Sequence, residues 1–521
     1  MNAPKITRAW LCLLAAIAGV FIHSAAAAEE TKPAQRPNII FILADDLSYG
    51  DLSCFGQKHF STPNIDRLAS EGRVFANAYA AGSWCAPSRT GLLTGRNWSK
   101  AAPAANSEGK KKFCPTVAEL LKTAGYSTCA LGKWHMQEGG NNWVHARTLE
   151  ELEKHKKDTV WSQMPWNRGF DVCRIGYRLG DNPYYPHGLE YGDNQEISLQ
   201  QNHRIEYTYL YKYFKEGGSL FNAEGRYVDA SGSSDLRYSE DLYRNEALTF
   251  MRANKDKPFF LYYATSLMHG PLAVPSLGRF KDMPKEWTSP HKFWAAMVET
   301  LDASVGLILD EVKKLGIEKN TIICFTSDNG YSAWGYFGRS NWQDDPVFQN
   351  KGPWNRGKFV NTNGGLIVPF IAWGPGRIPA GKTGRAINFY DLMATAGELS
   401  GAKLPGPTDG ASFVPLLEGR DQDQPVRATM VWKGTRNERM KADPWGPEEK
   451  VPGKTQPLIP DSVLLDEKWY AIGLHEIPAE RAPTPPPRAL HLFDVTADPG
   501  MAQDLATSRT DLCERALKAL R

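Results

Sequence analysis

The chain has 521 residues, of which 42% are hydrophobic and 23% are charged, a composition that excludes a disordered or low-complexity protein. This length exceeds one typical hydrophobic core, so we expect one large domain and a smaller one. A formal net charge of +3 argues against a nucleic-acid-binding surface, and any anion site must therefore be local.

Residues 1–28 predict a signal peptide. Lys5 and Arg8 precede an apolar stretch at residues 9–22, and the alanines at residues 25–28 fit a cleavage site. The stretch is short for a membrane span, although an uncleaved anchor is the alternative. No later segment is long and apolar enough to cross a bilayer. We therefore expect an exported protein, periplasmic or secreted, without stable membrane insertion after cleavage.

Continuous apolar runs predict strands that are buried on both faces of a parallel sheet. They lie at residues 37–44, 258–264, 321–326 and 366–373. Helical periodicity appears at residues 116–124 and 293–315. This alternation predicts a doubly wound α/β fold, with a mixed, mostly parallel sheet flanked by helices. Ligands of such sheets bind at the carboxyl ends of the strands, so the polar residues that follow these runs are candidate site residues.

The pattern changes in two other regions. Residues 177–241 read as a long insertion with little regular structure. From about residue 410, short strands are predicted at residues 429–432, 463–474 and 490–495, followed by a helix at residues 502–519. We therefore expect a main α/β domain at residues 29–409 and a smaller α+β subdomain with an antiparallel sheet at residues 410–521.

Cys85 begins the most informative segment, which is Cys-Ala-Pro-Ser-Arg-Thr-Gly-Leu-Leu-Thr-Gly at residues 85–95. Pro87 suits the first turn of a helix, which would place Cys85 at a helix N-terminus. Three residues separate Cys85 from Arg89, whereas Cys-dependent phosphatases have five. The segment resembles the sulfatase maturation signature, Cys-x-Pro-Ser-Arg-x-x-Leu-x-Thr-Gly, in which the cysteine is oxidised to formylglycine. The alternative is an inert core cysteine.

Two polar pairs end predicted strands, Asp45-Asp46 and Asp328-Asn329. They offer only oxygen donors, which suits Ca²⁺ or Mg²⁺. By itself the second pair also fits a simple turn, because Asn-Gly is a common turn dipeptide. The sulfatase resemblance implies that both pairs, together with the modified Cys85, hold one Ca²⁺, with Mg²⁺ as the less favoured ion. Two-zinc phosphatases of similar fold carry Asp-His at the second pair.

Lys133, His135 and His269 are further candidate site residues. Alone, each would be an ordinary surface lysine or buried histidine. Gly-Lys-Trp-His at residues 132–135 matches a sulfatase motif, which implies that Lys133 contacts sulfate and that His135 serves a formylglycine hydroxyl. His269 matches the His-x-Pro element of the family, which implies an acid for the leaving alcohol. That task suits a side chain that titrates near neutrality.

Lys358 stands six residues before Gly364-Gly365, where the family has its remaining active-site lysine. Lys351 is a nearby competitor. Asn363 and Ile367 replace the acidic and basic residues of the family pattern, so we expect local packing and substrate contacts to differ there from the family. The resemblance implies that Lys358, Arg89 and Lys133 stabilise charge on the sulfate oxygens.

The chain is thus identified as a member of the type I, formylglycine-dependent sulfatases of the alkaline phosphatase-like superfamily. The resemblance implies hydrolysis of a sulfate ester to alcohol and inorganic sulfate, after a formylglycine-generating enzyme has modified Cys85. A sulfated saccharide is the favoured substrate over other sulfated small molecules, because aromatic residues that can stack on sugars cluster before Lys358. They are Tyr331, Trp334, Tyr336, Trp342 and Trp354.

Three alternatives remain open from the sequence. The aromatic residues of this cluster fit the packing of a long loop equally well. A phosphonate monoester or phosphodiester hydrolase could share the fold and even formylglycine. A non-catalytic binder of sulfated glycans would keep an unmodified Cys85.

Overall fold

A computed structural model describes residues 36–101, 113–136, 163–176, 190–191, 239–270, 272–274, 276–337, 343–434, 458–476, 486–487 and 489–521. Residues 37–521 form one compact unit. The predicted signal peptide and almost all of the predicted insertion at residues 177–241 lie outside the described residues. None of the helices in the described ranges has both the length and the apolar composition needed to cross a bilayer.

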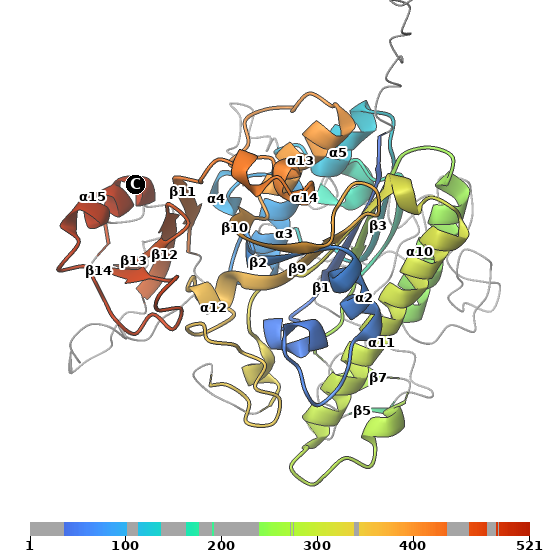
Figure 1. Cartoon of the computed structure of the whole chain (residues 1–521), viewed down its shortest axis with the longest axis horizontal. Helices are drawn as coiled ribbons and strands as arrows, with labels where there is room; N and C mark the ends of the chain where they lie inside the picture. The colour runs from blue at the N-terminus through green and yellow to red at the C-terminus, as the bar shows by residue number, and fades with distance from the viewer. Residues whose placement is uncertain are drawn as a thin grey trace, which may run out of the picture. The chain divides into compact units, whose positions relative to one another are not determined.

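The main sheet of this unit has eight strands (Figure 1). In spatial order they are β10 (Gly381–Asn388), β2 (Arg73–Tyr79), β9 (Ile367–Trp373), β8 (Thr321–Ser327), β1 (Asn38–Ala44), β6 (Phe259–Ala264), β3 (Ser127–Lys133) and β4 (Val172–Gly176). β9 runs antiparallel to both of its neighbours, and all other neighbouring strands are parallel. The sheet is therefore mixed and mostly parallel, as the sequence predicts.

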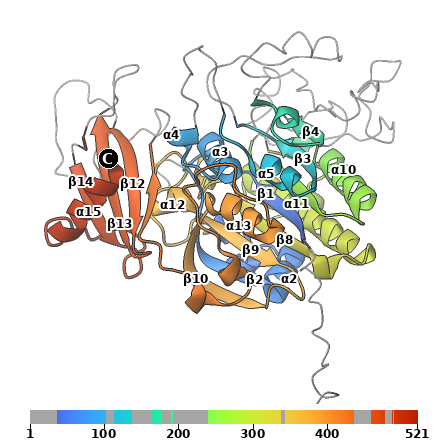
Figure 2. The ribbon, with the colours of Figure 1, turned by 90° about the horizontal axis from the view of Figure 1, so that it is seen from above.

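The apolar run of β1 shows why the sheet is central. Alternate side chains of a strand point to opposite faces. Ile39, Phe41 and Leu43 enter one hydrophobic core, whereas Ile40 and Ile42 enter the other. Helices cover both faces (Figures 1 and 2). One core takes side chains from α3 (Cys85–Thr94), α5 (Val117–Thr123) and α13 (Asp391–Ser400), and the other from α2 (Pro63–Glu71), α10 (Ser239–Asn254) and α11 (Ser289–Lys314).

The four predicted apolar strands and both predicted helices are present, with shifted ends. α11 begins at Ser289 rather than at residue 293, because Thr288 forms a capping box and Pro290 fits the first turn. The strands β2, β4 and β10 of the main sheet were not predicted. β10 lies at the edge of the sheet and is exposed at several positions, so its sequence Gly-Lys-Thr-Gly-Arg-Ala-Ile-Asn has no continuous apolar run.

A second, four-stranded antiparallel sheet follows near the C-terminus, with one helix packed on it (Figure 2). Its elements are β11 (Thr429–Trp432), β12 (Leu458–Leu465), β13 (Trp469–Glu476), β14 (Ala489–Asp494) and α15 (Thr510–Leu520). The predicted single strand at residues 463–474 is wrong, because left-handed Asp466 and Glu467 turn the chain back between β12 and β13. The last helix is shorter than predicted. The domain boundary at residue 410 stays a prediction.

Four neighbouring parallel strands, β8, β1, β6 and β3, end at the same edge of the main sheet. In this register Ala44 pairs with Ser327, so the residues after β1 lie beside the residues after β8. Lys133 ends β3, and His269 follows β6 within five residues. The predicted site residues from separate parts of the sequence therefore meet at this edge.

Candidate active site

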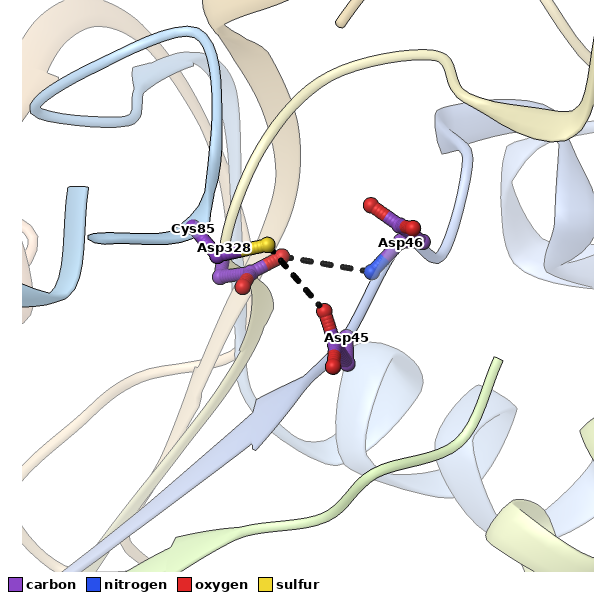
Figure 3. Close-up of side chains that lie close together, drawn as sticks. All are labelled: Asp45, Asp46, Cys85 and Asp328. Carbon is purple, nitrogen blue, oxygen red and sulfur yellow. Dashed lines mark hydrogen bonds between the residues drawn. The ribbon is translucent and has the colours of Figure 1, made fainter. Parts of the chain in front are cut away.

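The carboxylates of Asp45, Asp46 and Asp328 lie together at the ends of β1 and β8, and all three are buried (Figure 3). One oxygen of each and the Cys85 Sγ all lie within 4.8 Å of one another. The backbone N–H of Asp46 donates to Asp328 Oδ1 at 3.2 Å, and Asn329 Nδ2 donates to Asp46 Oδ1 at 2.9 Å. These bonds join the two polar pairs into one cluster.

Cys85 is the first residue of α3, as predicted, and its side chain points into the carboxylate cluster. Its Sγ lies 3.6 Å from Asp45 Oδ1, 3.7 Å from Asn329 Oδ1 and 3.3 Å from Lys133 Nζ. Burial and the charge of Asp328 raise the pKa of the Cys85 thiol to about 12. The unmodified side chain is therefore a neutral thiol at pH 7.

Each carboxylate of the cluster has a cationic partner. The pairs are Arg89 Nε with Asp328 Oδ2 at 2.9 Å, Lys133 Nζ with Asp45 Oδ2 at 2.6 Å, and Lys358 Nζ with Asp46 Oδ1 at 2.6 Å. Lys351, the competitor, is not at the site, and its backbone N–H donates to Asp344. Burial opposes ionisation of Asp46, but the nearby charge of Lys358 favours it, and the pKa of Asp46 is lowered.

The residues of this cluster fit a bound divalent cation. Three carboxylates and the Asn329 amide oxygen form a buried set of hard oxygen donors, which is the chemistry that Ca²⁺ and Mg²⁺ prefer. Arg89, Lys133 and Lys358 already match the three carboxylates in charge. A divalent cation would leave the site positively charged, which suits an anionic sulfate ester.

Two histidines border the cluster. His269 Nδ1 lies 2.8 Å from the Gly270 carbonyl oxygen, and its Nε2 lies 3.9 Å from Asp46 Oδ2. A carbonyl only accepts, so Nδ1 carries the proton of the neutral ring. Burial and the charges of Lys133 and Lys358 lower the pKa of His269 to about 4. The ring is therefore neutral at pH 7, unlike the near-neutral titration expected from the sequence.

His135 stands two residues after the end of β3, in a left-handed backbone conformation with φ of 46°. Burial and the charges of Lys133 and Arg89 lower its pKa well below the ordinary value, so it is a neutral base. Within the described ranges, its Nδ1 is buried and has no hydrogen-bond partner.

Gly364 and Gly365 hold the loop after β8 in place. The backbone N–H groups of Gly330 and Tyr331 donate to the carbonyls of Gly365 and Gly364, at 2.9 and 3.1 Å. A Cβ on Gly330 would lie 2.1 Å from the Gly364 oxygen, so only glycine fits there. Asn363, which departs from the family pattern, is buried and bonds to Asn355 and Pro499. The Asn363 side chain therefore has a structural role, because its hydrogen bonds hold these neighbouring segments together.

Tyr336 is a site residue whose contacts the sequence did not predict. Its hydroxyl lies 3.0 Å from Asp46 Oδ2, to which it donates, and accepts from the Gly270 N–H at 3.0 Å. It thus joins the carboxylate cluster to the loop that carries His269. Nothing in the sequence distinguishes this tyrosine from Tyr331, whose hydroxyl bonds to the Gln343 carbonyl instead.

The described members of the predicted aromatic cluster do not form one sugar-binding surface. Tyr331 is buried, and Trp354 packs against Tyr49 with ring centroids 4.5 Å apart. Trp342 and the side chain of Trp334 lie outside the described residues. The described members of this cluster therefore fit the alternative of loop packing.

Comparisons with known proteins agree with this geometry. A protein-family model described as Sulfatase matches residues 37–402. N-acetylgalactosamine-6-sulfatase of Rattus norvegicus is 32% identical over 415 residues, which are 75% of this chain and 68% of that protein. N-acetylgalactosamine-6-O-sulfatase of Bacteroides thetaiotaomicron is 28% identical over 513 residues, covering 92% and 91%.

Among solved structures, the fold is similar to Ps i-CgsB in complex with k-i-k-neocarrahexaose. The TM-score is 0.64 at 25% identity, and the match covers 93% of this chain and 92% of that one. The likeness therefore includes the C-terminal antiparallel sheet as well as the main one.

Proposed function

Because the chain belongs to the sulfatase family and is a sulfuric ester hydrolase, we propose that its substrate is a sulfated carbohydrate. The observation that supports the sulfate part of this proposal is the buried cluster in which Cys85 lies beside three carboxylates and three cationic side chains. Hydrolysis of an anionic ester needs such a charge-matched pocket. Relatives named for N-acetylgalactosamine 6-sulfate and a similar structure in complex with a neocarrahexaose support the carbohydrate part.

Arg89, Lys133 and Lys358 are placed to bind the sulfate group. Each of their ammonium and guanidinium groups bonds to a different carboxylate of the cluster that Cys85 faces, which fixes its position. Cationic groups that are already oriented stabilise the charge that develops on the sulfate oxygens without reorganisation. They also orient the ester so that its sulfur faces residue 85.

Two groups would complete the site. Formylglycine made from Cys85 would supply a hydrated aldehyde with one hydroxyl for attack on sulfur and a second to release the sulfate afterwards. A divalent cation held by Asp45, Asp46, Asp328 and Asn329 would supply Lewis acidity. We favour Ca²⁺ over Mg²⁺, because three carboxylates and an amide oxygen suit the larger ion, whereas Mg²⁺ keeps more of its water.

The two histidines divide the proton transfers. His135 is neutral and holds an unpartnered Nδ1 within the described ranges, so it is suited to accept a proton from residue 85. His269 presents Nε2 toward Asp46, and once this nitrogen is protonated it is suited to protonate the leaving alcohol oxygen. The negative charge of a bound sulfate ester raises the pKa of His269 and counteracts the effect of Lys133 and Lys358.

The protein also needs a partner and a location that suit this chemistry. A formylglycine-generating enzyme must act on Cys85 before or during folding, because Cys85 is buried in the folded chain. We place the mature protein outside the cytoplasm, in the periplasm or secreted, on the basis of the predicted signal peptide at residues 1–28.

A screen for sulfate release tests the substrate. The matured protein is incubated with defined sulfated saccharides, beginning with N-acetylgalactosamine 6-sulfate, and with a paired aryl sulfate and aryl phosphodiester. Release from a saccharide, faster than phosphodiester hydrolysis, is expected. Turnover of the aryl sulfate alone would contradict the carbohydrate proposal, and preferred phosphodiester hydrolysis would contradict a sulfatase function.

Metal removal tests the ion. The protein is treated with a chelator until activity is lost, and Ca²⁺, Mg²⁺ or Zn²⁺ is then added back. Ca²⁺ is expected to restore both the activity and the melting temperature best, because every carboxylate donor of the cluster is a hard oxygen. Better recovery with Zn²⁺ would contradict the proposed ion.

A further inference from the structure

Two aromatic residues are direct neighbours, along the chain, of active-site residues. They are Trp84 and Phe359, and we call them the aromatic rim. Trp84 precedes Cys85, and Phe359 follows Lys358. Their ring centroids are 6.4 Å apart, with an angle of 34° between the ring planes. The Trp84 ring also lies 6.1 Å from that of His135. The aromatic rim and the His135 imidazole therefore form a continuous row of rings.

The aromatic rim adjoins the cluster of charges. Lys358 Nζ lies 5.4 Å from the centroid of the Phe359 ring and 2.6 Å from Asp46 Oδ1. The ring is thus separated from the cluster by a single ammonium group. In addition, the Phe359 N–H donates to the Ser83 carbonyl at 2.8 Å, which ties the two rim segments together.

Phe359 has two features that do not favour the stability of the folded protein, an exposed ring and a left-handed backbone. Its side chain is 37% exposed, and only two other large hydrophobic side chains in the described ranges, Leu307 and Val426, are exposed. Its φ of 70° lies in the left-handed region that non-glycine residues rarely adopt. Strained residues of this kind gather at ligand-binding sites. An exposed ring on a strained backbone therefore points to a role in ligand binding.

We propose that the aromatic rim binds the apolar face of the sugar ring that carries the scissile sulfate. This inference rests on the proposed function and adds the residues that recognise the alcohol part of the substrate. With the sulfate against Lys358, the attached sugar lies within reach of Phe359 and Trp84. The C–H groups of a sugar face carry a small positive charge, which is attracted to the negative face of an aromatic ring. A saccharide therefore matches both the charge and the shape of this entrance.

Binding measurements on an inactive parent protein test the aromatic rim independently of turnover. The parent carries Cys85→Ala, and the ligands are N-acetylgalactosamine 6-sulfate, other sulfated monosaccharides from the screen, and inorganic sulfate. Phe359→Ala and Trp84→Leu are each expected to weaken sugar binding about tenfold, as for the loss of an aromatic contact. Inorganic sulfate should bind all variants equally, because it does not reach the aromatic rim.

Matched variants separate recognition from folding. Phe359→Tyr and Trp84→Phe keep a ring and should bind within about twofold of the parent, and Leu307→Ala, another exposed apolar residue, should have no effect. Unchanged sugar binding in Phe359→Ala and Trp84→Leu would overturn the inference. So would an equal loss of sugar and sulfate binding, or a parent that binds none of the sulfated sugars.

Kinetics of the matured enzyme separate a failure of the aromatic rim from a failure of the proposed substrate. In the matured enzyme, Phe359→Ala is expected to raise KM for the sulfated saccharide about tenfold and to leave kcat within about twofold. Failure of the matured wild-type protein to release sulfate from any saccharide would contradict the proposed substrate. Sulfate release that Phe359→Ala and Trp84→Leu leave unchanged would contradict only the aromatic rim.

Discussion

The active site has two parts that differ in almost every physical respect, a buried floor and an exposed rim. The floor is the buried cluster of Cys85, the carboxylates around it and their cationic partners. Its Cys85 and carboxylates lie at the start of a helix and at strand ends, and its charges are paired. The aromatic rim lies beside these elements, with Phe359 exposed and Trp84 half-buried. Rigid elements hold catalytic groups precisely, whereas residues next to them can vary with the substrate. Changes to the floor should therefore act on kcat, and changes to the rim on KM.

The largest expected effect comes from Cys85→Ala. The change removes the thiol whose oxidation would produce the formylglycine, so sulfate release should fall by at least about 10⁴-fold, while the melting temperature stays close to that of the wild type. Sulfate release and thermal unfolding are measured together. Cys324→Ala, in the middle of β8, is the control for loss of a buried thiol and should retain turnover. Substantial turnover by Cys85→Ala would show that sulfate release does not depend on residue 85.

Lys358→Ala should have the next largest effect. Under the proposed function its ammonium group, 2.6 Å from Asp46, stabilises the sulfate oxygens, so kcat should fall about 10²- to 10³-fold. Lys351→Ala is the matched control, because that lysine is close in sequence but not at the site. Steady-state kinetics on one sulfate ester compare the two variants. A greater loss of kcat in Lys351→Ala than in Lys358→Ala would show that Lys351 is the active-site lysine.

Tyr336→Phe should have a moderate effect. Loss of its hydroxyl removes one hydrogen bond to Asp46 and leaves the Gly270 N–H without its acceptor. A loss of about 1–2 kcal/mol corresponds to a roughly tenfold lower kcat. The rise in melting temperature on addition of Ca²⁺ should also be smaller, which a remote packing change would not cause. Tyr331→Phe, whose hydroxyl bonds to Gln343, should keep the full response to Ca²⁺.

The smallest expected effect is on stability, at the rim. Phe359→Gly should stabilise the protein by about 0.5–1 kcal/mol, because relief of the strain at a φ of 70° exceeds the extra conformational entropy that glycine loses on folding. Denaturant unfolding measures this change, and Phe359→Ala, which keeps the Cβ, should not show it. A stabilised Phe359→Gly that binds the saccharide poorly would show that the rim favours recognition at the expense of stability. A destabilised variant would mean that the ring supports the fold.

The floor could be predicted from the sequence because its geometry follows from regular structure. Apolar runs identify β1 and β8, and the polar pairs directly after them must meet at one edge when the strands are parallel neighbours. The Cys85 segment and Lys133 carry recognisable spacing. The choice of Lys358 over Lys351 depended on the resemblance alone, and the structure supplies the contact with Asp46.

The rim and the supporting tyrosine could not be predicted, because they depend on loop packing. The sequence predicted a sugar-binding cluster from aromatic residues that are close along the chain. In the folded protein, Tyr331 is buried and the Tyr336 hydroxyl bonds to Asp46, whereas Trp84 and Phe359 meet from segments 275 residues apart. The edge strand β10 was missed for a related reason, since its exposed positions hide the apolar pattern.

The central claim is that this chain hydrolyses sulfate esters with a formylglycine made from Cys85. Mass spectrometry of the peptide that carries residue 85, taken from a preparation that releases sulfate, tests it most directly. The predicted peptide has lost one sulfur and two hydrogens and has gained one oxygen relative to the cysteine form. An active preparation in which every copy of this peptide retains its thiol would contradict the claim.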